Sequence, residues 1–150
     1  MDNLHAILTP YLKKRYYPLI RFWAGERPDA RDSEMLRAIA AQVGYPTAPV
    51  DPITLGQLRT VGWQDAATIM AKCATGLVYS SRPRQSVADN MKLALKDLAG
   101  NAQFFTNVHF GSEGSDTNYS WAPISTATID AGVIGYDDHK AFIFWAEDED

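Results

Sequence analysis

The spacing of apolar residues predicts helices over the first hundred residues. Between residues 3 and 23 apolar side chains recur at intervals of three and four, the spacing of one helix face, and Pro10 and Pro18 are expected to kink or divide that run. The clearest helix opens at Ser86 with a near capping box and ends at Gly100. We predict about five helices, at residues 3–23, 33–43, 54–61, 64–79 and 87–99.

From residue 102 onward the pattern changes to that of strands. Residues 103–110 and 117–128 are rich in aromatic and β-branched side chains, which favour extended backbone. Residues 129–136 and 140–146 flank a short turn at residues 137–139 and are predicted to form a β-hairpin. In the last of these segments phenylalanines alternate with Ile143 and Trp145, so this strand is apolar on both faces. Such a strand is expected to pack on helices and to be covered again or contacted by a partner.

These patterns predict an α+β protein with one domain, residues 1–150. The helices of residues 1–100 are expected to pack on one face of a three- or four-stranded, mainly antiparallel sheet within residues 101–150. The 150 residues are 46% hydrophobic and 21% charged, which is typical of an ordinary globular domain. A single cysteine, Cys73, excludes an internal disulfide and is expected to lie in the core.

The first residues of the chain do not resemble an export signal. Their basic residues follow the apolar stretch instead of preceding it, and no uninterrupted apolar segment reaches membrane-spanning length. These features predict a cytoplasmic protein without a membrane segment.

Charge is distributed unevenly along the chain. Residues 1–100 hold 13 Lys and Arg against 9 Asp and Glu, whereas residues 101–150 hold Lys140 alone against 9 Asp and Glu. The second segment therefore carries eight negative charges in excess, which attract a basic partner and repel a nucleic-acid backbone. The alternative is an acidic face that serves only solubility.

Candidate catalytic groups do not form a recognisable motif. His109 stands near Ser112 and Asp116, but a hydrolase triad also needs a strained nucleophile turn, and the chain has no G-x-S-x-G sequence. Asp137, Asp138 and His139 are contiguous and cannot surround a metal ion without further ligands. We therefore predict no catalytic residue, no metal and no cofactor, and we do not expect an enzyme.

The carboxyl-terminal segment has the composition of a protein interface. Aromatic side chains supply most of the binding energy at interfaces, and acidic side chains steer a basic partner. The predicted partner-binding residues are Tyr136, Asp137, Asp138, Trp145, Glu147, Asp148, Glu149 and Asp150. The alternative is that Trp121 and Trp145 belong to the core and that residues 147–150 form a frayed tail.

Residues 130–150 close with an aromatic strand and an acidic terminus, and their last 19 residues read GVIGYDDHKAFIFWAEDED. This segment resembles the end of small immunity proteins of bacterial polymorphic toxin systems, which include contact-dependent growth inhibition and type VI secretion. The resemblance implies a cytoplasmic inhibitor of a cognate toxin, often a basic nuclease whose active site an acidic surface can block.

Two other functions stay open. One is a small enzyme or ligand-binding domain with a pocket near His109, Tyr119 and Trp121. The other is nucleic-acid binding through Lys13, Lys14 and Arg15, which we rank last because three adjacent charges are a very local patch.

Overall fold

The computed structural model describes residues 2–13, 19–45, 58–75, 84–111, 115–121, 124–125 and 129–148. The helical elements are α1 (Asp2–Leu8), the 3-10 turn η1 (Thr9–Lys13), α2 (Asp32–Ala41), α4 (Trp63–Thr75) and α5 (Gln85–Leu95). The strands are β1 (Leu19–Glu26), β2 (Arg59–Val61), β3 (Gln103–Thr106), β4 (Val108–Gly111), β5 (Ser115–Trp121), β6 (Ile129–Tyr136) and β7 (Lys140–Asp148). This content confirms the predicted α+β class.

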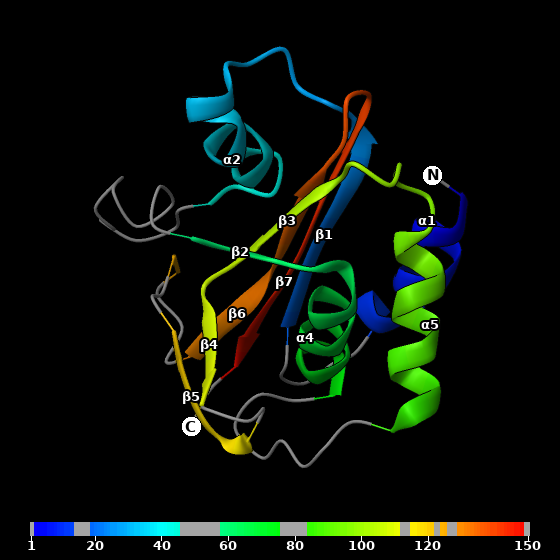
Figure 1. Ribbon diagram of the computed structural model, residues 1–150, viewed down its shortest axis with the longest axis vertical. Helices are drawn as coiled ribbons and strands as arrows, with labels where there is room; N and C mark the ends of the chain where they lie inside the picture. Colours follow the sequence, from blue (N-terminus) through cyan, green and yellow to red (C-terminus); the bar gives the residue numbers. More distant parts are fainter. Residues whose placement is uncertain are drawn as a thin grey trace.

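Five strands form the main sheet, in the order β1-β7-β6-β3-β2 (Figure 1). Each neighbouring pair is antiparallel, and β4 and β5 form a separate two-stranded sheet. The predicted hairpin is confirmed, because β6 pairs with β7 from Ile129 opposite Asp148 to Tyr136 opposite Ala141. The main sheet therefore has five strands instead of the three or four predicted.

The first half of the chain contributes two of the five strands, which corrects the all-helical prediction. β1 occupies residues predicted as the end of the first helix, and β2 occupies the end of the predicted helix at 54–61. β1 lies between Pro18 and Pro28, both of which disfavour helix. Its apolar side chains also alternate: Phe22 packs against the core on one face of the sheet and Trp23 against the core on the other. The two-residue period of a strand therefore describes this segment.

Helices cover both faces of the sheet, whereas the sequence predicted one covered face. α1, α4 and α5 contribute to a core cluster that contains Phe142 and Phe144 of β7. α2 contributes to the opposite cluster, which contains Ile143 and Trp145. Figure 1 shows α2 on one side of the sheet and α4 with α5 on the other. The apolar character of β7 on both faces is thus explained by a second layer of helix.

Cys73 lies in the core, as predicted. It has no exposed surface, and its thiol is 3.3 Å from the main-chain oxygen of Ala131 in β6. Burial raises the pKa of the Cys73 thiol far above its usual range, with a smaller contribution from the negative charge of Asp130. A nucleophilic cysteine needs the opposite setting, open and electropositive.

Candidate functional site

The predicted partner-binding residues lie at two opposite ends of the β6–β7 hairpin. Asp137 and Asp138 form the turn, whereas Glu147 and Asp148 are at the far end of β7. Seven residue steps separate Lys140 from Glu147, which corresponds to roughly 23 Å of strand. Figure 1 shows the turn at the top of the sheet and the chain end below it. The predicted single acidic surface is therefore divided, and Glu149 and Asp150 lie outside the described residues.

Trp145 is a core residue and not a surface anchor. Its side chain has no exposed area, and its ring meets the Tyr45 ring edge-on at 6.3 Å between centroids. Its indole N–H donates a hydrogen bond to Asp130, 3.0 Å away. A partner that docks on the surface would not touch this ring. Asp148 is also buried, with 7% of its surface exposed.

The charge of Glu147 is matched within the protein. Arg21 of the edge strand β1 donates to its carboxylate at 3.1 Å and to the Val43 carbonyl at 2.7 Å. The same guanidinium lies 4.7 Å from the centre of the Tyr45 ring. Glu147 therefore already has a cation within the protein.

A buried carboxylate that the sequence did not single out organises this half of the sheet. Asp130 accepts hydrogen bonds from the main-chain N–H groups of Ile124 and Ser125, from the Ser125 hydroxyl, from Trp145 and from the Asn107 amide, at 2.7 to 3.2 Å. Burial raises the pKa of Asp130, and the hydrogen bonds offset only part of that effect. Asp130 therefore ties residues 124–125 to β6 and β7.

Asp137 closes the β6–β7 turn. Its carboxylate accepts hydrogen bonds from the N–H groups of His139 and Lys140 at 2.7 Å and of Ala99 at 2.8 Å. Burial works against its ionisation, but these hydrogen bonds and the Lys140 charge outweigh burial and lower the pKa of Asp137. The negative charge is thus used to hold the turn against residue 99.

Tyr136 and Arg27 form a stacked pair beside this turn. The Tyr136 ring lies nearly parallel to that of Phe105, with centroids 5.8 Å apart, and the Arg27 guanidinium lies 5.0 Å from its centre. Arg27 also donates to the Asp137 carbonyl at 3.1 Å and to Asp32 at 2.8 Å. Only 7% of Tyr136 is exposed, so its ring supports Arg27 more than it offers contact area.

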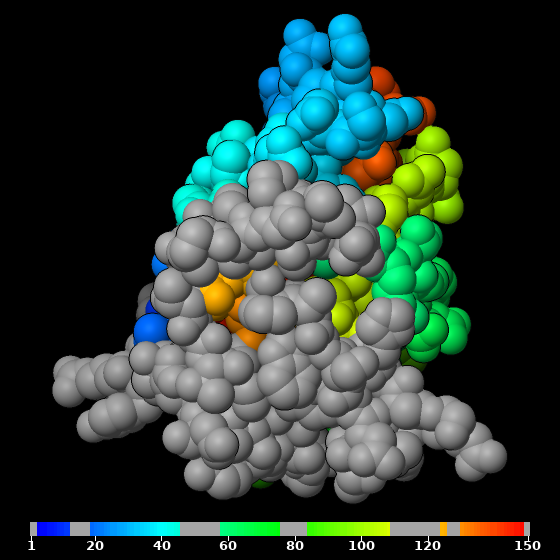
Figure 2. Space-filling model, turned by 90° about the vertical axis from the view of Figure 1, so that its left-hand side faces the viewer, coloured from blue at the N-terminus to red at the C-terminus, as the bar shows by residue number. Residues whose placement is uncertain are grey.

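Carboxylates from two distant segments gather around the turn, and we call this group the acidic end of the sheet. Two surface hollows of about 660 and 410 Å³ meet here and share Arg27 and Asp138. Figure 2 shows residues near 30, the β6–β7 turn and residues near 100 meeting at the top of the molecule. The carboxylates that line the hollows are Glu26, Asp29, Asp32, Asp137 and Asp138.

The acidic end keeps an excess of negative charge after its internal pairing. Arg27 is paired with Asp32, and the Lys140 ammonium acts on Asp137 and donates to the Asp97 carbonyl at 3.0 Å. Glu26, Asp29 and Asp138 are the remaining carboxylates of the group; all three are exposed, and none forms an ion pair with a described residue. Three carboxylates therefore face the solvent without an ion pair to any described residue.

The alternative pocket near His109, Tyr119 and Trp121 falls outside the described side chains. These residues belong to β4 and β5, and their side chains lie outside the described part of the structure. Within the described ranges, no three His, Cys, Asp or Glu side chains are grouped so that they could hold a metal ion. No helix in those ranges is both long and apolar enough to cross a bilayer.

No family model, no curated protein and no solved structure matches this chain.

Proposed function

We propose that this protein binds and neutralises a basic partner protein, as an immunity protein does a toxin, and that the acidic end of the sheet is the contact surface. The main supporting observation is the group of three exposed carboxylates, Glu26, Asp29 and Asp138, none of which forms an ion pair with a described residue. The resemblance of residues 130–150 to immunity proteins supports the same class of function.

Electrostatic attraction, more than aromatic anchoring, would drive this binding. An exposed ion pair contributes only about 0.2–1 kcal/mol, so three carboxylates act mainly by raising the association rate and selecting a basic partner. Trp145 is buried and Tyr136 is nearly so, which removes the two aromatic anchors that the sequence suggested. Apolar contacts would have to come from other parts of the surface.

The proposed mechanism of inhibition is occlusion. A toxin that cleaves nucleic acid holds the phosphates with Lys and Arg side chains. The acidic end would pair with those side chains and exclude the substrate both by its charge and by its volume. Arg27 would oppose such a partner little, because its charge is already paired with Asp32. The Lys140 ammonium donates to the Asp97 carbonyl within the protein.

Colony survival tests the function directly. The probe is the carboxyl-terminal domain encoded by the gene immediately upstream, expressed in a susceptible bacterial host with and without this chain. We expect rescue only on co-expression, together with a co-purifying complex. A neighbour that is harmless, or that kills equally in both cases, would contradict the proposal.

Two variants of equal charge test the surface. Glu26→Gln with Asp29→Asn removes two charges from the acidic end, and neither side chain forms an ion pair with a described residue. Asp65→Asn with Asp89→Asn removes two exposed charges from α4 and α5. We expect the first variant to slow association roughly three- to ten-fold at low salt and the second to leave it unchanged. Equal rates for both variants would exclude the acidic end as the contact surface.

A further inference from the structure

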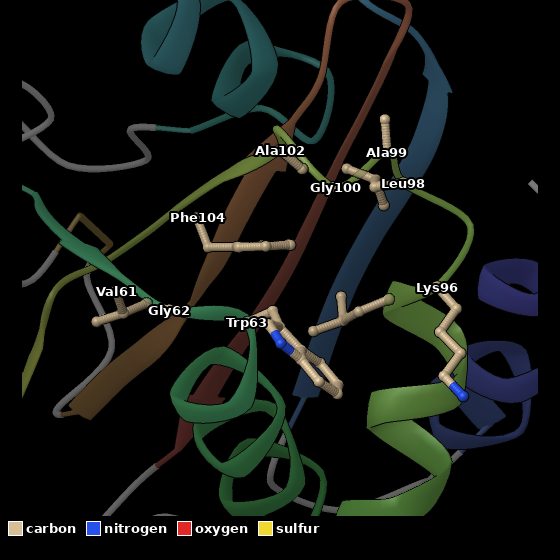
Figure 3. A pocket seen from close by; sticks show the side chains of 10 residues that line it. Val61, Gly62, Trp63, Lys96, Leu98, Ala99, Gly100, Ala102 and Phe104 are labelled. Atoms are coloured by element: carbon tan, nitrogen blue, oxygen red, sulfur yellow. The ribbon is translucent and has the colours of Figure 1, made fainter.

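A surface cavity beside Trp63 has no part in the proposed function. It measures about 390 Å³ and lies where α4 begins, α5 ends and β3 approaches them (Figure 3). Apolar side chains from all three regions line it, among them Val61, Leu95, Leu98 and Phe104. The volume is at the lower end of the range of small-molecule sites, roughly 300–1,000 Å³.

We propose that this cavity binds a small planar aromatic molecule that carries one anionic group. Trp63 provides the first reason, because 42% of its surface is exposed although it borders an apolar hollow. Figure 3 shows the Trp63 and Phe104 side chains reaching toward the same space from α4 and β3. Aromatic rings favour stacked or edge-on contact with another ring, and a bound ring would cover apolar surface that water now contacts.

The shape of the wall permits close approach of such a ring. At Gly62 and Gly100, which border the cavity, a Cβ atom would find no neighbouring heavy atom within 4 Å. The backbone at both glycines therefore faces open space. Together with the apolar side chains, these two glycines leave room for a rigid ring of one or two cycles.

Lys96 accounts for the anionic group. It is the one charged side chain among the ten residues that line the cavity. It is exposed, and it forms no ion pair with any described residue. The neighbouring Asp97 carboxylate accepts a hydrogen bond from the main-chain N–H of Leu4, 2.8 Å away, and forms no ion pair with Lys96. Lys96 therefore places one positive charge at the edge of the cavity, and Figure 3 shows its side chain at the end of α5.

Matched ligands separate the two parts of this proposal. The full chain is titrated with 2-naphthoate and with the neutral 2-naphthalenemethanol by isothermal calorimetry. We expect saturable binding of 2-naphthoate, a loss of at least ten-fold in Trp63→Ala, and no change in Leu93→Ala, which removes an equally exposed apolar side chain from α5. Lys96→Gln is expected to weaken 2-naphthoate about three-fold and to leave the neutral ligand unchanged, as for an exposed ion pair.

Gly100→Leu gives an independent test, because it adds a side chain at the wall of the cavity without removing one. It is expected to weaken 2-naphthoate as strongly as Trp63→Ala, with an unchanged circular dichroism spectrum. Binding of 2-naphthoate that is unaffected in both variants would overturn the proposed site. Equal affinity for the charged and neutral ligands would overturn the anionic class. Sedimentation of the parent protein and of Trp63→Ala tests a second copy of the chain as the occupant. Self-association that Trp63→Ala abolishes would overturn the proposed small-molecule site.

Discussion

Replacement of Asp130 by alanine is expected to lower the free energy of unfolding by about 3–5 kcal/mol. Two of the donors that now bind this carboxylate have another option: the Ser125 hydroxyl can rotate, and the Asn107 amide also donates to the main-chain oxygen of residue 130. The other three donors have no alternative acceptor; they are the main-chain N–H groups of Ile124 and Ser125 and the indole N–H of Trp145. These three would remain buried without an acceptor.

The magnitude follows from those three donors. Each buried donor that loses its acceptor costs about 1–3 kcal/mol, which gives about 3–9 kcal/mol in total. Two effects reduce this sum: water can enter the vacated space, and the protein no longer has to bury a charge whose pKa is raised. The lower part of the range is therefore expected. A domain of this size has a total stability of about 5–15 kcal/mol, so the variant is expected to fold but to unfold at lower denaturant concentration.

Urea denaturation followed by far-ultraviolet circular dichroism measures this loss. With a slope of about 2 kcal/mol per molar urea, the midpoint is expected to fall by roughly 2 M. Asp138→Ala serves as the control, because that carboxylate is exposed on the same hairpin, and its loss is expected to stay below about 0.5 kcal/mol. If Asp130→Ala and Asp138→Ala unfold at the same urea concentration, the carboxylate of Asp130 does not hold residues 124–125 to the sheet.

Three further predictions concern single residues. The folded protein lowers the pKa of Asp137, so the ionised carboxylate stabilises the fold above its unfolded pKa, and this stabilisation is lost as pH falls through the folded pKa. In denaturation experiments between pH 7 and 2, Asp137→Asn should therefore lose less stability on acidification than the parent protein. Gly132→Ala should lower the free energy of unfolding, measured by thermal denaturation, by about 1–3 kcal/mol or more, because the new Cβ would lie 2.7 Å from the Trp145 Cα. Gly100→Ala is the control and should be close to neutral, because no heavy atom lies within 4 Å of its Cβ. Cys73 should resist a thiol reagent in the native protein and react fully in urea, and native labelling on the time scale of mixing would contradict its burial.

The sequence predicted those helices and strands whose formation depends on residues close together in the chain. The β6–β7 hairpin and helices α2, α4 and α5 lie where the periodicity placed them, within a few residues at their ends. β1 was missed because its apolar residues fit both a helical and an extended spacing, and because its pairing partner lies more than a hundred residues away. The prolines on either side of β1 were the signal that could have decided for a strand.

The candidate site was only partly predictable for the same reason. Asp137 and Asp138 were placed correctly in a turn, but Glu26, Asp29 and Asp32 were counted with the basic half of the chain. β1 delivers these three to the same end of the sheet, since Glu26 pairs with Lys140. The net charge of each half of the sequence therefore did not reveal which carboxylates lie close together in the folded protein. The burial of Trp145, in contrast, was predictable, because its strand is apolar on both faces.

The position of β1 also determines when the protein can finish folding. Glu26 and Leu19 pair with Lys140 and Glu147, which are 114 and 128 positions further along the chain. At a synthesis rate of about 5–20 residues per second, β1 waits roughly 6 to 25 s on the ribosome before β7 exists. During that interval its apolar side chains and main-chain hydrogen-bonding groups lack the strand that later covers them. Nascent chains of this protein are therefore expected to depend on chaperones that hold an early, unpaired strand.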